Sequence, residues 1–393
     1  MSKQIRVGIL GATGMVGQHF ITLLQGHPWF KITALAASPR SAGRPYAEAV
    51  GNRWSMAVPL PADVAKLPVF AVREDLDKIA GQVDLIFSAL DLDKVAIQQL
   101  EIDYAAAGVA VVSNNSAHRW TDDVPVLMPE INPEHVALID YQRTKRGWST
   151  GLIAGKPNCS IQSYTSILTA LRTFEPIDVA VTSLQAISGA GKTFETWPEM
   201  VDNVIPLIGG EEDKSEREPL KIWGTLQDDH VELATQPRIV ATCIRVPVTD
   251  GHMAAVSVRF KHEPTEQQIL DAINSFKSPV AGLGLPSAPK QLIKYFDDPD
   301  RPQTRLDRDY ERGMGITMGR LRPDPHFGWR FVSLAHNTVR GAAGGAILMA
   351  ELLVSKGYVG KSPDQSFVDT VKVMSDTPPI SNEDIVNYRK KHK

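Results

Sequence analysis

Cysteine is scarce in this sequence, since only Cys159 and Cys243 occur among 393 residues. Two thiols exclude a disulfide framework and a cysteine-rich zinc site, because both need more cysteines. We therefore expect no bound metal, at least one thiol that is free to react, and a reducing compartment, the cytoplasm.

Long apolar runs and blocks of one charge are also missing. The apolar run at 346–353 is far shorter than the roughly 20 residues that a membrane span needs, so no membrane association is expected. Lysine and arginine number 42 against 45 acidic residues, the net charge is −3, and a nucleic-acid partner is not expected. The 43% hydrophobic content is typical of a globular protein long enough for two domains.

The first part of the chain alternates apolar runs rich in β-forming residues with segments of helical pattern. Four such runs lie at 5–10, 32–37, 83–87 and 109–112. This alternation is typical of βαβ units on a parallel sheet. It predicts an α/β fold with a doubly wound, Rossmann-like, NADP-binding domain at 1–157, completed by a C-terminal helix at about 338–370.

In the second part, predicted strands follow one another, at 183–187, 239–248, 254–260 and 331–335. That order predicts an α+β domain with a mainly antiparallel or mixed sheet, over 158–337. A capped helix should begin near Thr265 and pack on this sheet. The charged stretch at 211–218 is predicted to be a surface helix or loop.

A glycine-rich turn follows the first strand and precedes a helix that should begin near Met15. Strand, glycine turn and helix are the context of a dinucleotide-binding motif, in which backbone amides approach a pyrophosphate. A tight turn without a ligand is the alternative. The motif residues are Gly11, Ala12, Thr13, Gly14, Met15, Val16 and Gly17.

The end of the second strand carries Ser38, Arg40 and Ser41, where a site that prefers NAD would place an acidic residue. Hydroxyls and a guanidinium suit a 2′-phosphate, so NADP is favoured over NAD. A solvated loop charge is the alternative for Arg40.

Cys159 follows a short strand and a Pro157-Asn158 turn, and a helical pattern begins at Ile161. A helix N-terminus lowers the pKa of a thiol and offers amide donors to a developing oxyanion, which makes Cys159 a candidate nucleophile. An inert buried thiol is the alternative. We predict that Cys243, in the middle of a strand, is such a core residue.

A thiolate that adds to an aldehyde needs an acid/base group, and His252 is the best placed of ten histidines, in a turn between two predicted strands. Arg245 interrupts an apolar strand, which is costly unless an anion meets it. That anion is either a substrate carboxylate or an internal carboxylate.

These motifs together resemble the aspartate-semialdehyde dehydrogenase family, in its archaeal and fungal branch, over nearly the whole chain. The segments that carry the resemblance are Gly-Ala-Thr-Gly-Met-Val-Gly at 11–17, Pro-Asn-Cys-Ser at 157–160 and Arg-Val-Pro-Val-Thr-Asp-Gly-His at 245–252. Further family-like segments lie at 113–119, 184–191, 210–214 and 337–344.

The resemblance implies reversible, NADPH-dependent conversion of aspartyl 4-phosphate to aspartate 4-semialdehyde through a thioester, in the biosynthesis of lysine, threonine and methionine. It implies a homodimer or homotetramer formed through the second domain. The implied catalytic residues are Cys159 as nucleophile, His252 as acid/base, and Asn158 and Gln185 as groups that position the acyl intermediate.

The resemblance also implies substrate contacts. Arg245 would bind the α-carboxylate and Glu212 the ammonium group, although whether Glu211 or Glu212 faces the ligand is left open. Arg119 and Lys214 would bind phosphate. The nicotinamide end of the cofactor would lie near Ser88, Ala89, Leu90, Ser188, Gly189 and Asn337.

Two other interpretations stay open. A relative with the same thioester chemistry could act on malonyl-CoA or on an N-acetylglutamyl phosphate, neither of which has a free amine for Glu212 to meet. A non-catalytic NADP-binding protein is the alternative from another class.

Overall fold

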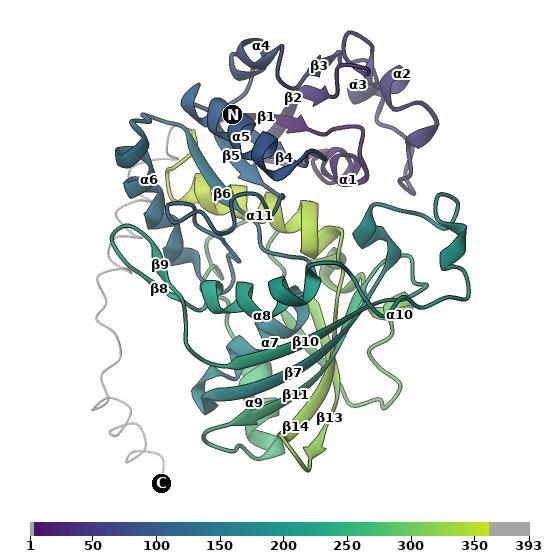
Figure 1. Ribbon diagram of the computed structural model, residues 1–393, viewed down its shortest axis with the longest axis vertical. Helices are drawn as coiled ribbons and strands as arrows, with labels where there is room; N and C mark the ends of the chain where they lie inside the picture. Colours follow the sequence, from purple (N-terminus) through teal and green to yellow (C-terminus); the bar gives the residue numbers. More distant parts are fainter. Residues whose placement is uncertain (1–3, 361–393) are drawn as a thin grey trace.

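The computed structural model describes residues 4–360, which form two domains (Figure 1). The first contains a six-stranded parallel sheet in the order β3-β2-β1-β4-β5-β6. Its strands are β1 (Ile5–Leu10), β2 (Phe30–Ala37), β3 (Val69–Ala71), β4 (Leu85–Ser88), β5 (Ala110–Ser113) and β6 (Leu152–Gly155). Its helices are α1 (Met15–Leu23), α2 (Tyr46–Val50), α3 (Ala62–Ala65), α4 (Leu76–Ala80), α5 (Lys94–Ala106) and α6 (Leu138–Arg146).

Both faces of this first sheet are covered. All residues of β4, β5 and β6 are buried, as expected for parallel strands with helices on both sides. The predicted doubly wound fold is confirmed. The short strand β3 was not predicted, because three residues carry too little periodicity to distinguish a strand from a loop.

The second domain contains a mixed six-stranded sheet in the order β10-β7-β11-β14-β13-β12. The β7–β10 and β12–β13 pairs are parallel and the other pairs antiparallel, so the predicted mixed sheet is confirmed. The strands are β7 (Pro176–Gln185), β10 (Arg238–Arg245), β11 (His252–Phe260), β12 (Ile293–Phe296), β13 (Ile316–Asp324) and β14 (Gly328–Ala335). The other elements are α7 (Gln162–Ala170), α8 (Glu211–Ile222), α9 (Glu266–Ser275), α10 (Thr304–Asp307) and a hairpin of β8 (Thr225–Leu226) and β9 (Val231–Glu232).

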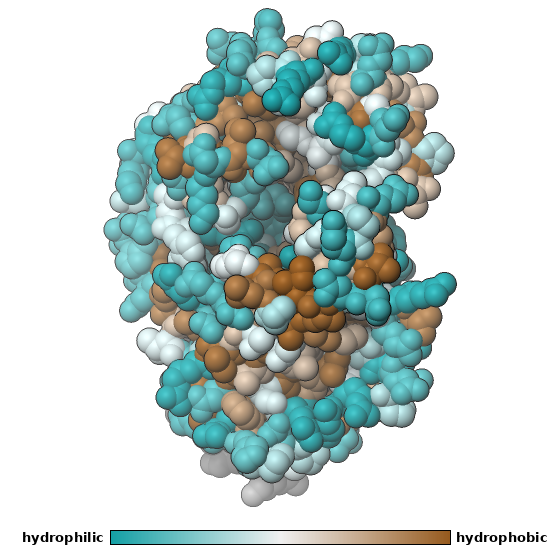
Figure 2. Space-filling model, turned by 45° about the vertical axis from the view of Figure 1, so that its right-hand side comes forward, coloured by the Kyte–Doolittle hydropathy of each residue, from teal (hydrophilic) through white to brown (hydrophobic). Residues whose placement is uncertain are grey.

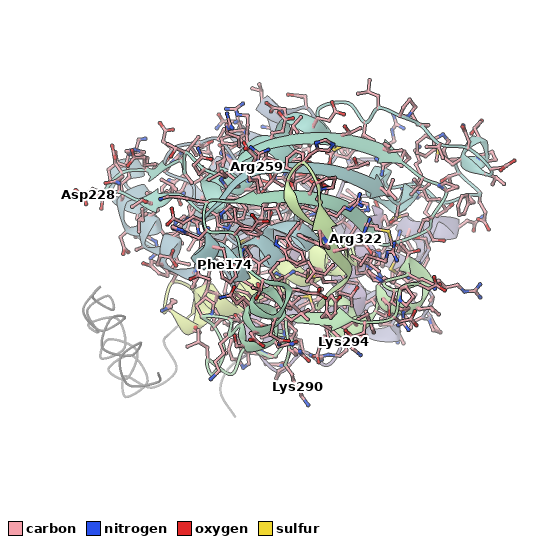
Figure 3. All side chains as sticks on the ribbon, turned by 90° about the horizontal axis from the view of Figure 1, so that it is seen from below. Phe174, Asp228, Arg259, Lys290, Lys294 and Arg322 are labelled. Carbon is pink, nitrogen blue, oxygen red and sulfur yellow. The ribbon has the colours of Figure 1, made fainter. Side chains whose placement is uncertain are left out.

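One face of the mixed sheet is packed and the other is open. Side chains of α7 and α9, such as Ile167 and Ile269, share a hydrophobic core with Val181 of β7. On the opposite face, Thr242 of β10 and Ala255 of β11 are exposed. The open face extends to Arg322 of β13, and Figure 3 shows this residue together with Arg259 of β11 from below.

Helix α11 (Gly344–Ser355), after a π-helical turn at Val339–Ala343, returns to the first domain. Its residues Ile347 and Leu352 share a hydrophobic core with Val7 of β1 and Phe20 of α1. In Figure 1 it lies at the level where the two domains meet. The part of the predicted helix beyond Gly360 lies outside the described residues.

Two local predictions concern helices of the second domain. Helix α9 begins with the expected capping box, in which Thr265 and Gln268 exchange side-chain and backbone hydrogen bonds. The stretch at 211–218 lies in the surface helix α8, as predicted: Asp213 and Arg217 are exposed, whereas Glu211, Ser215 and Glu218 form a buried face that was not predicted. None of the helices within residues 4–360 has the length and apolar character to cross a membrane.

Candidate active site

Cys159 lies where the chain passes from the first domain to the second. It follows β6 and precedes α7, which begins at Gln162. The turn before α11 packs directly on it, because a Cβ added at Gly341 would lie 2.6 Å from the Cβ of Cys159. Elements of both domains therefore fix the position of this half-buried thiol.

His252 is the partner of this thiol. Its Nε2 lies 3.5 Å from Sγ of Cys159, and its Nδ1 accepts a hydrogen bond from the backbone N–H of Ala186 at 3.1 Å. Because Nδ1 accepts, the proton of the neutral ring is on Nε2 and faces the sulfur. Burial, with the positive charge of Arg245, lowers the pKa of His252 to about 3, so the ring is neutral at physiological pH.

The ionisation of Cys159 differs from the sequence-based expectation. Burial, together with the negative charge of Glu211, raises the pKa of its thiol to about 11. The positive charges of Lys156, Arg119 and Arg245 act in the opposite direction. The expected lowering at a helix start is not found, because removing the thiolate from water outweighs these attractions.

Arg245 is the last residue of β10 and is 5% exposed. Its Nη1 donates to the carbonyl oxygen of Ala186 at 2.6 Å, which ties it to the residue that also orients His252. Among residues 4–360 no carboxylate forms an ion pair with Arg245, so an internal salt bridge does not account for this buried cation there. Its charge is available to an anionic ligand.

The rotation of α8 about its axis decides which glutamate faces the thiol of Cys159. The Glu211 carboxylate accepts from Nδ2 of Asn158, at 3.1 Å to each oxygen, and from Nζ of Lys214 at 2.7 Å. Glu212 instead accepts the backbone N–H of Cys243 at 3.2 Å, and Glu216 accepts that of Ala241 at 3.0 Å.

Glu212 is predicted to bind the substrate ammonium group, but its carboxylate points at the backbone of β10. Glu212 and Glu216 lie one turn apart on α8 and satisfy N–H groups at the free edge of β10, a common way to cover an edge strand. One oxygen of each carboxylate accepts a hydrogen bond from the backbone of β10. The carboxylate beside Cys159 is that of Glu211.

Arg119 and Glu218 form a buried ion pair that also contacts the backbone just before Cys159. Nη1 of Arg119 donates to Glu218 at 2.8 Å, and the other carboxylate oxygen of Glu218 accepts the backbone N–H of Asn158 at 2.6 Å. Nε of Arg119 donates to the carbonyl oxygen of Lys156 at 2.8 Å. Neither Glu218 nor Lys156 was predicted from the sequence, although Glu218 follows Glu211 at a spacing of seven residues, which indicates the same helix face.

Gln185, at the end of β7, pairs in register with Arg245 of β10. Its Nε2 donates to Oγ of Ser183 at 3.1 Å, and the residue is buried. Cys243 is fully buried in β10, as predicted. The strand register thus places Gln185 and Arg245 side by side at one end of the sheet.

The glycine turn packs so closely against neighbouring backbone that only glycine fits at two of its positions. Gly11 has a φ of +81°, and a Cβ there would lie 2.2 Å from the carbonyl oxygen of Ala89. A Cβ at Gly17 would lie 2.3 Å from the Gly11 oxygen. Helix α1 begins at Met15, as predicted, and no side chain caps its first turn, so N–H groups remain for an anion.

The residues predicted to contact the cofactor gather in two places. Residues 11–16 and 88–90 meet at the carboxyl ends of β1 and β4. Ser188, Gly189 and Asn337 lie beside the Cys159–His252 pair. Nδ2 of Asn337 donates to Oγ of Ser188 at 2.8 Å, and a Cβ at Gly189 would lie 3.0 Å from Nε2 of His252. Figure 2 shows a hollow between the two domains.

Ser38, Arg40 and Ser41 follow β2 in a turn in which the Ser41 N–H donates to the Ser38 oxygen at 2.9 Å. Ser38 and Arg40 are exposed, whereas Ser41 is buried. Within residues 4–360 no carboxylate pairs with Arg40, and no group of three histidine, cysteine or acidic side chains could hold a metal ion.

The fold and the site together define a two-domain NAD(P)-binding protein with a thiol–imidazole pair at the domain junction. A family model for "Semialdehyde dehydrogenase, NAD binding domain" matches residues 6–139, and one for "Semialdehyde dehydrogenase, dimerisation domain" matches residues 168–340. The chain belongs to the aspartate-semialdehyde dehydrogenase family.

Individual relatives support this membership. The chain is 45% identical to an aspartate-semialdehyde dehydrogenase of Archaeoglobus fulgidus, over 90% of this chain and 99% of that protein. It is 44% identical to that of Schizosaccharomyces pombe, with the same coverage. A crystal structure of the Candida albicans enzyme with NADP superposes with a TM-score of 0.80 at 37% identity, over 91% of this chain and all of that one. A Vibrio cholerae enzyme complexed with ASA gives a TM-score of 0.69 at 26% identity, over 90% and 99%.

Proposed function

We propose that this protein interconverts aspartyl 4-phosphate and aspartate 4-semialdehyde, with NADP as the redox cofactor and Cys159 as the nucleophile. The observation that carries the proposal is the charge arrangement around the Cys159–His252 pair. Arg245, Glu211 and Lys214 supply a cation, an anion and a second cation, which match a carboxylate, an ammonium and a phosphate. The relatives in Archaeoglobus and Schizosaccharomyces carry the corresponding name.

In the reductive direction, the Cys159 thiolate attacks the acyl phosphate carbon, and the C–S bond forms as the phosphate leaves. His252 presents its Nε2–H toward the sulfur and is placed to donate a proton to the oxygen of the tetrahedral species. Because its Nδ1 is held by the Ala186 N–H, the ring keeps this donor orientation. Lys214 and Arg119 would bind the departing phosphate.

Asn158 has a positioning role in this scheme. Its Oδ1 accepts from both the backbone N–H and the hydroxyl of Ser160, at 2.7 and 2.6 Å, while its Nδ2 holds Glu211. These bonds fix the loop that carries Cys159. Gln185, beside Arg245, is proposed to bind the acyl oxygen.

The first domain fits NADP. The glycines at 11 and 17 leave room only for backbone, the uncapped start of α1 suits a pyrophosphate, and Arg40 with the serine hydroxyls suits a 2′-phosphate. NADPH, when bound, would supply the hydride that reduces the thioester. Ser188, Gly189 and Asn337 would hold its nicotinamide end beside His252.

We also propose that two copies associate through the open face of the mixed sheet. Ala180, Thr182 and Ala255 line a shallow hollow there, and Val240 is 60% exposed. Val201 and Leu207 of the same domain are exposed as well, and Figure 2 shows apolar residues gathered below the hollow between the domains. Exposed apolar area of this kind is typical of an oligomer interface.

The proposal is tested by following NADPH formation from aspartate semialdehyde and phosphate, with NAD⁺ in place of NADP⁺ as the comparison. We expect phosphate-dependent turnover that Cys159→Ala abolishes. No turnover with this aldehyde would refute the substrate, and malonyl-CoA and an N-acetylglutamyl phosphate would then be tested. Full activity of Cys159→Ala would refute the mechanism.

A further inference from the structure

Two carbonyl groups of the glycine turn accept hydrogen bonds from buried side chains to which the proposed function gives no role. The hydroxyl of Tyr46 donates to the carbonyl oxygen of Ala12 at 2.7 Å, and Nε2 of Gln18 donates to that of Thr13 at 3.1 Å. Tyr46 is fully buried and Gln18 is 1% exposed. Water therefore has little access to compete for these two bonds.

These are the two carbonyl groups that a longer helix α1 would use. In an α-helix each N–H donates to the carbonyl four residues earlier, so Val16 would pair with Ala12. Gly17 would pair with Thr13 in the same way. Neither pair forms in the described part of the chain, where the N–H groups of Met15, Val16 and Gly17 have no acceptor. The start of α1 thus keeps three donors for an anion.

The bond from Tyr46 also sets the direction of a fourth donor. The carbonyl of Ala12 and the N–H of Thr13 belong to one planar trans peptide unit, so they point in opposite directions. With the carbonyl held toward Tyr46, the N–H of Thr13 points away from it, and this N–H has no acceptor within residues 4–360. The N–H groups of Gly11 and Ala12 are used, since both donate to the Ala36 oxygen, at 2.9 and 3.0 Å.

Both side chains are themselves fixed by other segments of the first domain. Tyr46 is the first residue of α2, and its N–H donates to the Leu67 oxygen at 2.8 Å. Nε2 of Gln18 also donates to the Arg53 oxygen at 2.8 Å, and its Oε1 accepts the N–H of Ser55 at 2.8 Å. The segment 46–55 therefore holds the glycine turn through two side chains, one from each partner.

We infer that Tyr46 and Gln18 are positioning residues of the cofactor site. They hold the carbonyl groups of Ala12 and Thr13, and the N–H groups at the start of α1 are thereby left free and directed at the pyrophosphate. The inference rests on the proposed function, because it concerns the dinucleotide assigned there to the first domain. Since NADP and NAD share the pyrophosphate, both residues serve the two cofactors equally, unlike Arg40, which is proposed to bind the 2′-phosphate.

The test is the dissociation constant of NADPH and of NADH, measured by fluorescence titration without substrate, in the parent, Tyr46→Phe and Tyr104→Phe. Tyr104 is the matched control, because it is fully buried in the same domain and its hydroxyl donates to the Val72 oxygen at 2.7 Å. Tyr46→Phe should raise both Kd values by the same factor, about twofold to tenfold, as expected for one lost hydrogen bond. Tyr104→Phe should lower the thermal midpoint to a similar extent and keep the parental Kd values.

Gln18→Met and Gln142→Met form a second pair. Gln142 is also fully buried, its Nε2 donates to the oxygens of Asp123 and Ile153 at 2.8 and 3.0 Å, and its Oε1 accepts the N–H of Ile153 at 2.8 Å. Gln18→Met should raise both Kd values, whereas Gln142→Met should not. In activity assays, Tyr46→Phe should raise the KM for NADP and keep kcat at saturating cofactor within about twofold, a split that a general loss of stability does not produce.

Parental Kd values in folded Tyr46→Phe and Gln18→Met would overturn the inference. A rise confined to NADPH would also overturn it, because the effect would then arise in the turn at 38–41. A parent that binds neither dinucleotide would refute the proposed cofactor and this inference together. Failure to turn over aspartate semialdehyde would refute the proposed substrate alone, since the titrations contain no substrate.

Discussion

The carboxylate of Glu211 accepts hydrogen bonds from the side-chain amide of Asn158, with 3.1 Å from Nδ2 to each oxygen. Asn158 precedes Cys159, so this contact fixes the first turn of α8 beside the nucleophile. The same negative charge raises the pKa of the Cys159 thiol. A substrate ammonium that binds Glu211 would neutralise this charge and favour the thiolate.

Glu211→Gln should therefore weaken binding of aspartate semialdehyde. A hydrogen bond to a charged group contributes about 1.5–3 kcal/mol, which corresponds to an increase in KM of about tenfold to a hundredfold. Glu212→Gln is the matched control, because its carboxylate accepts the backbone N–H of Cys243. Steady-state kinetics that reverse the order of the two variants would contradict this assignment.

The choice between Glu211 and Glu212 shows where sequence reasoning stops. The alternation of strands and helices, the glycine turn before α1 and the turn before α7 could be predicted, because each depends on local pattern. Which glutamate faces Cys159 depends on the rotation of α8 about its axis, and β10 fixes that rotation by presenting free N–H groups to Glu212 and Glu216.

Other features depend on contacts between distant segments. The approach of Gly341 to Cys159 and the burial of Lys156 arise when α11 returns to the first domain. The pKa of Cys159 was expected to be low from its position at a helix start. Burial raises it instead, and part of that burial comes from the distant turn at Gly341, which no local pattern indicates.

Gly189→Ala should impair catalysis without unfolding the protein. The added Cβ would lie 2.9 Å from Nη1 of Arg245 and 3.0 Å from Nε2 of His252, so both side chains must move. Misplacement of such groups by a fraction of an ångström to one ångström costs about tenfold to a hundredfold in kcat/KM. Gly209→Ala, at an open position, should keep the parental value, and equal activity of both variants would show that Gly189 is not constrained.

Arg40→Glu should reduce the preference for NADP over NAD. The exposed guanidinium is replaced by a carboxylate, which repels a 2′-phosphate and can accept from a 2′-hydroxyl. The KM for NADP should rise about tenfold or more, and the KM for NAD should fall or stay the same. The exposed Lys66 offers the same charge change at another site of the domain. If Lys66→Glu and Arg40→Glu behave alike, the effect is one of net charge.

Ala255→Glu should convert the oligomer to a monomer. Ala255 is exposed in the middle of the open sheet face, and a carboxylate there would be buried without a partner when two copies associate. Light scattering coupled to size-exclusion chromatography gives the mass of each species. Ala62→Glu, at an exposed position of the first domain, should leave the mass unchanged. A dimeric Ala255→Glu would place the interface elsewhere.

His135 links stability to pH. Burial lowers the pKa of His135 to about 4, in a site where Nδ1 accepts from Asn132 at 3.0 Å and Nε2 donates to the Gly224 oxygen at 3.2 Å. The unfolded histidine titrates near ~6.5, so between these values the unfolded state binds a proton that the folded state does not. The stability contributed by the neutral ring is complete above about pH 6.5 and is lost as the pH falls toward 4.

Urea unfolding measured at pH 6 and pH 5 tests this linkage. His135→Gln keeps an acceptor and a donor but does not titrate in this range, so it should lose about 1 kcal/mol less than the parent between the two values. His19 and His252, whose pKa values burial lowers to about 4 and about 3, remain in both proteins and cancel in the comparison. The same loss in both proteins would mean that His135 is protonated without cost in the folded state.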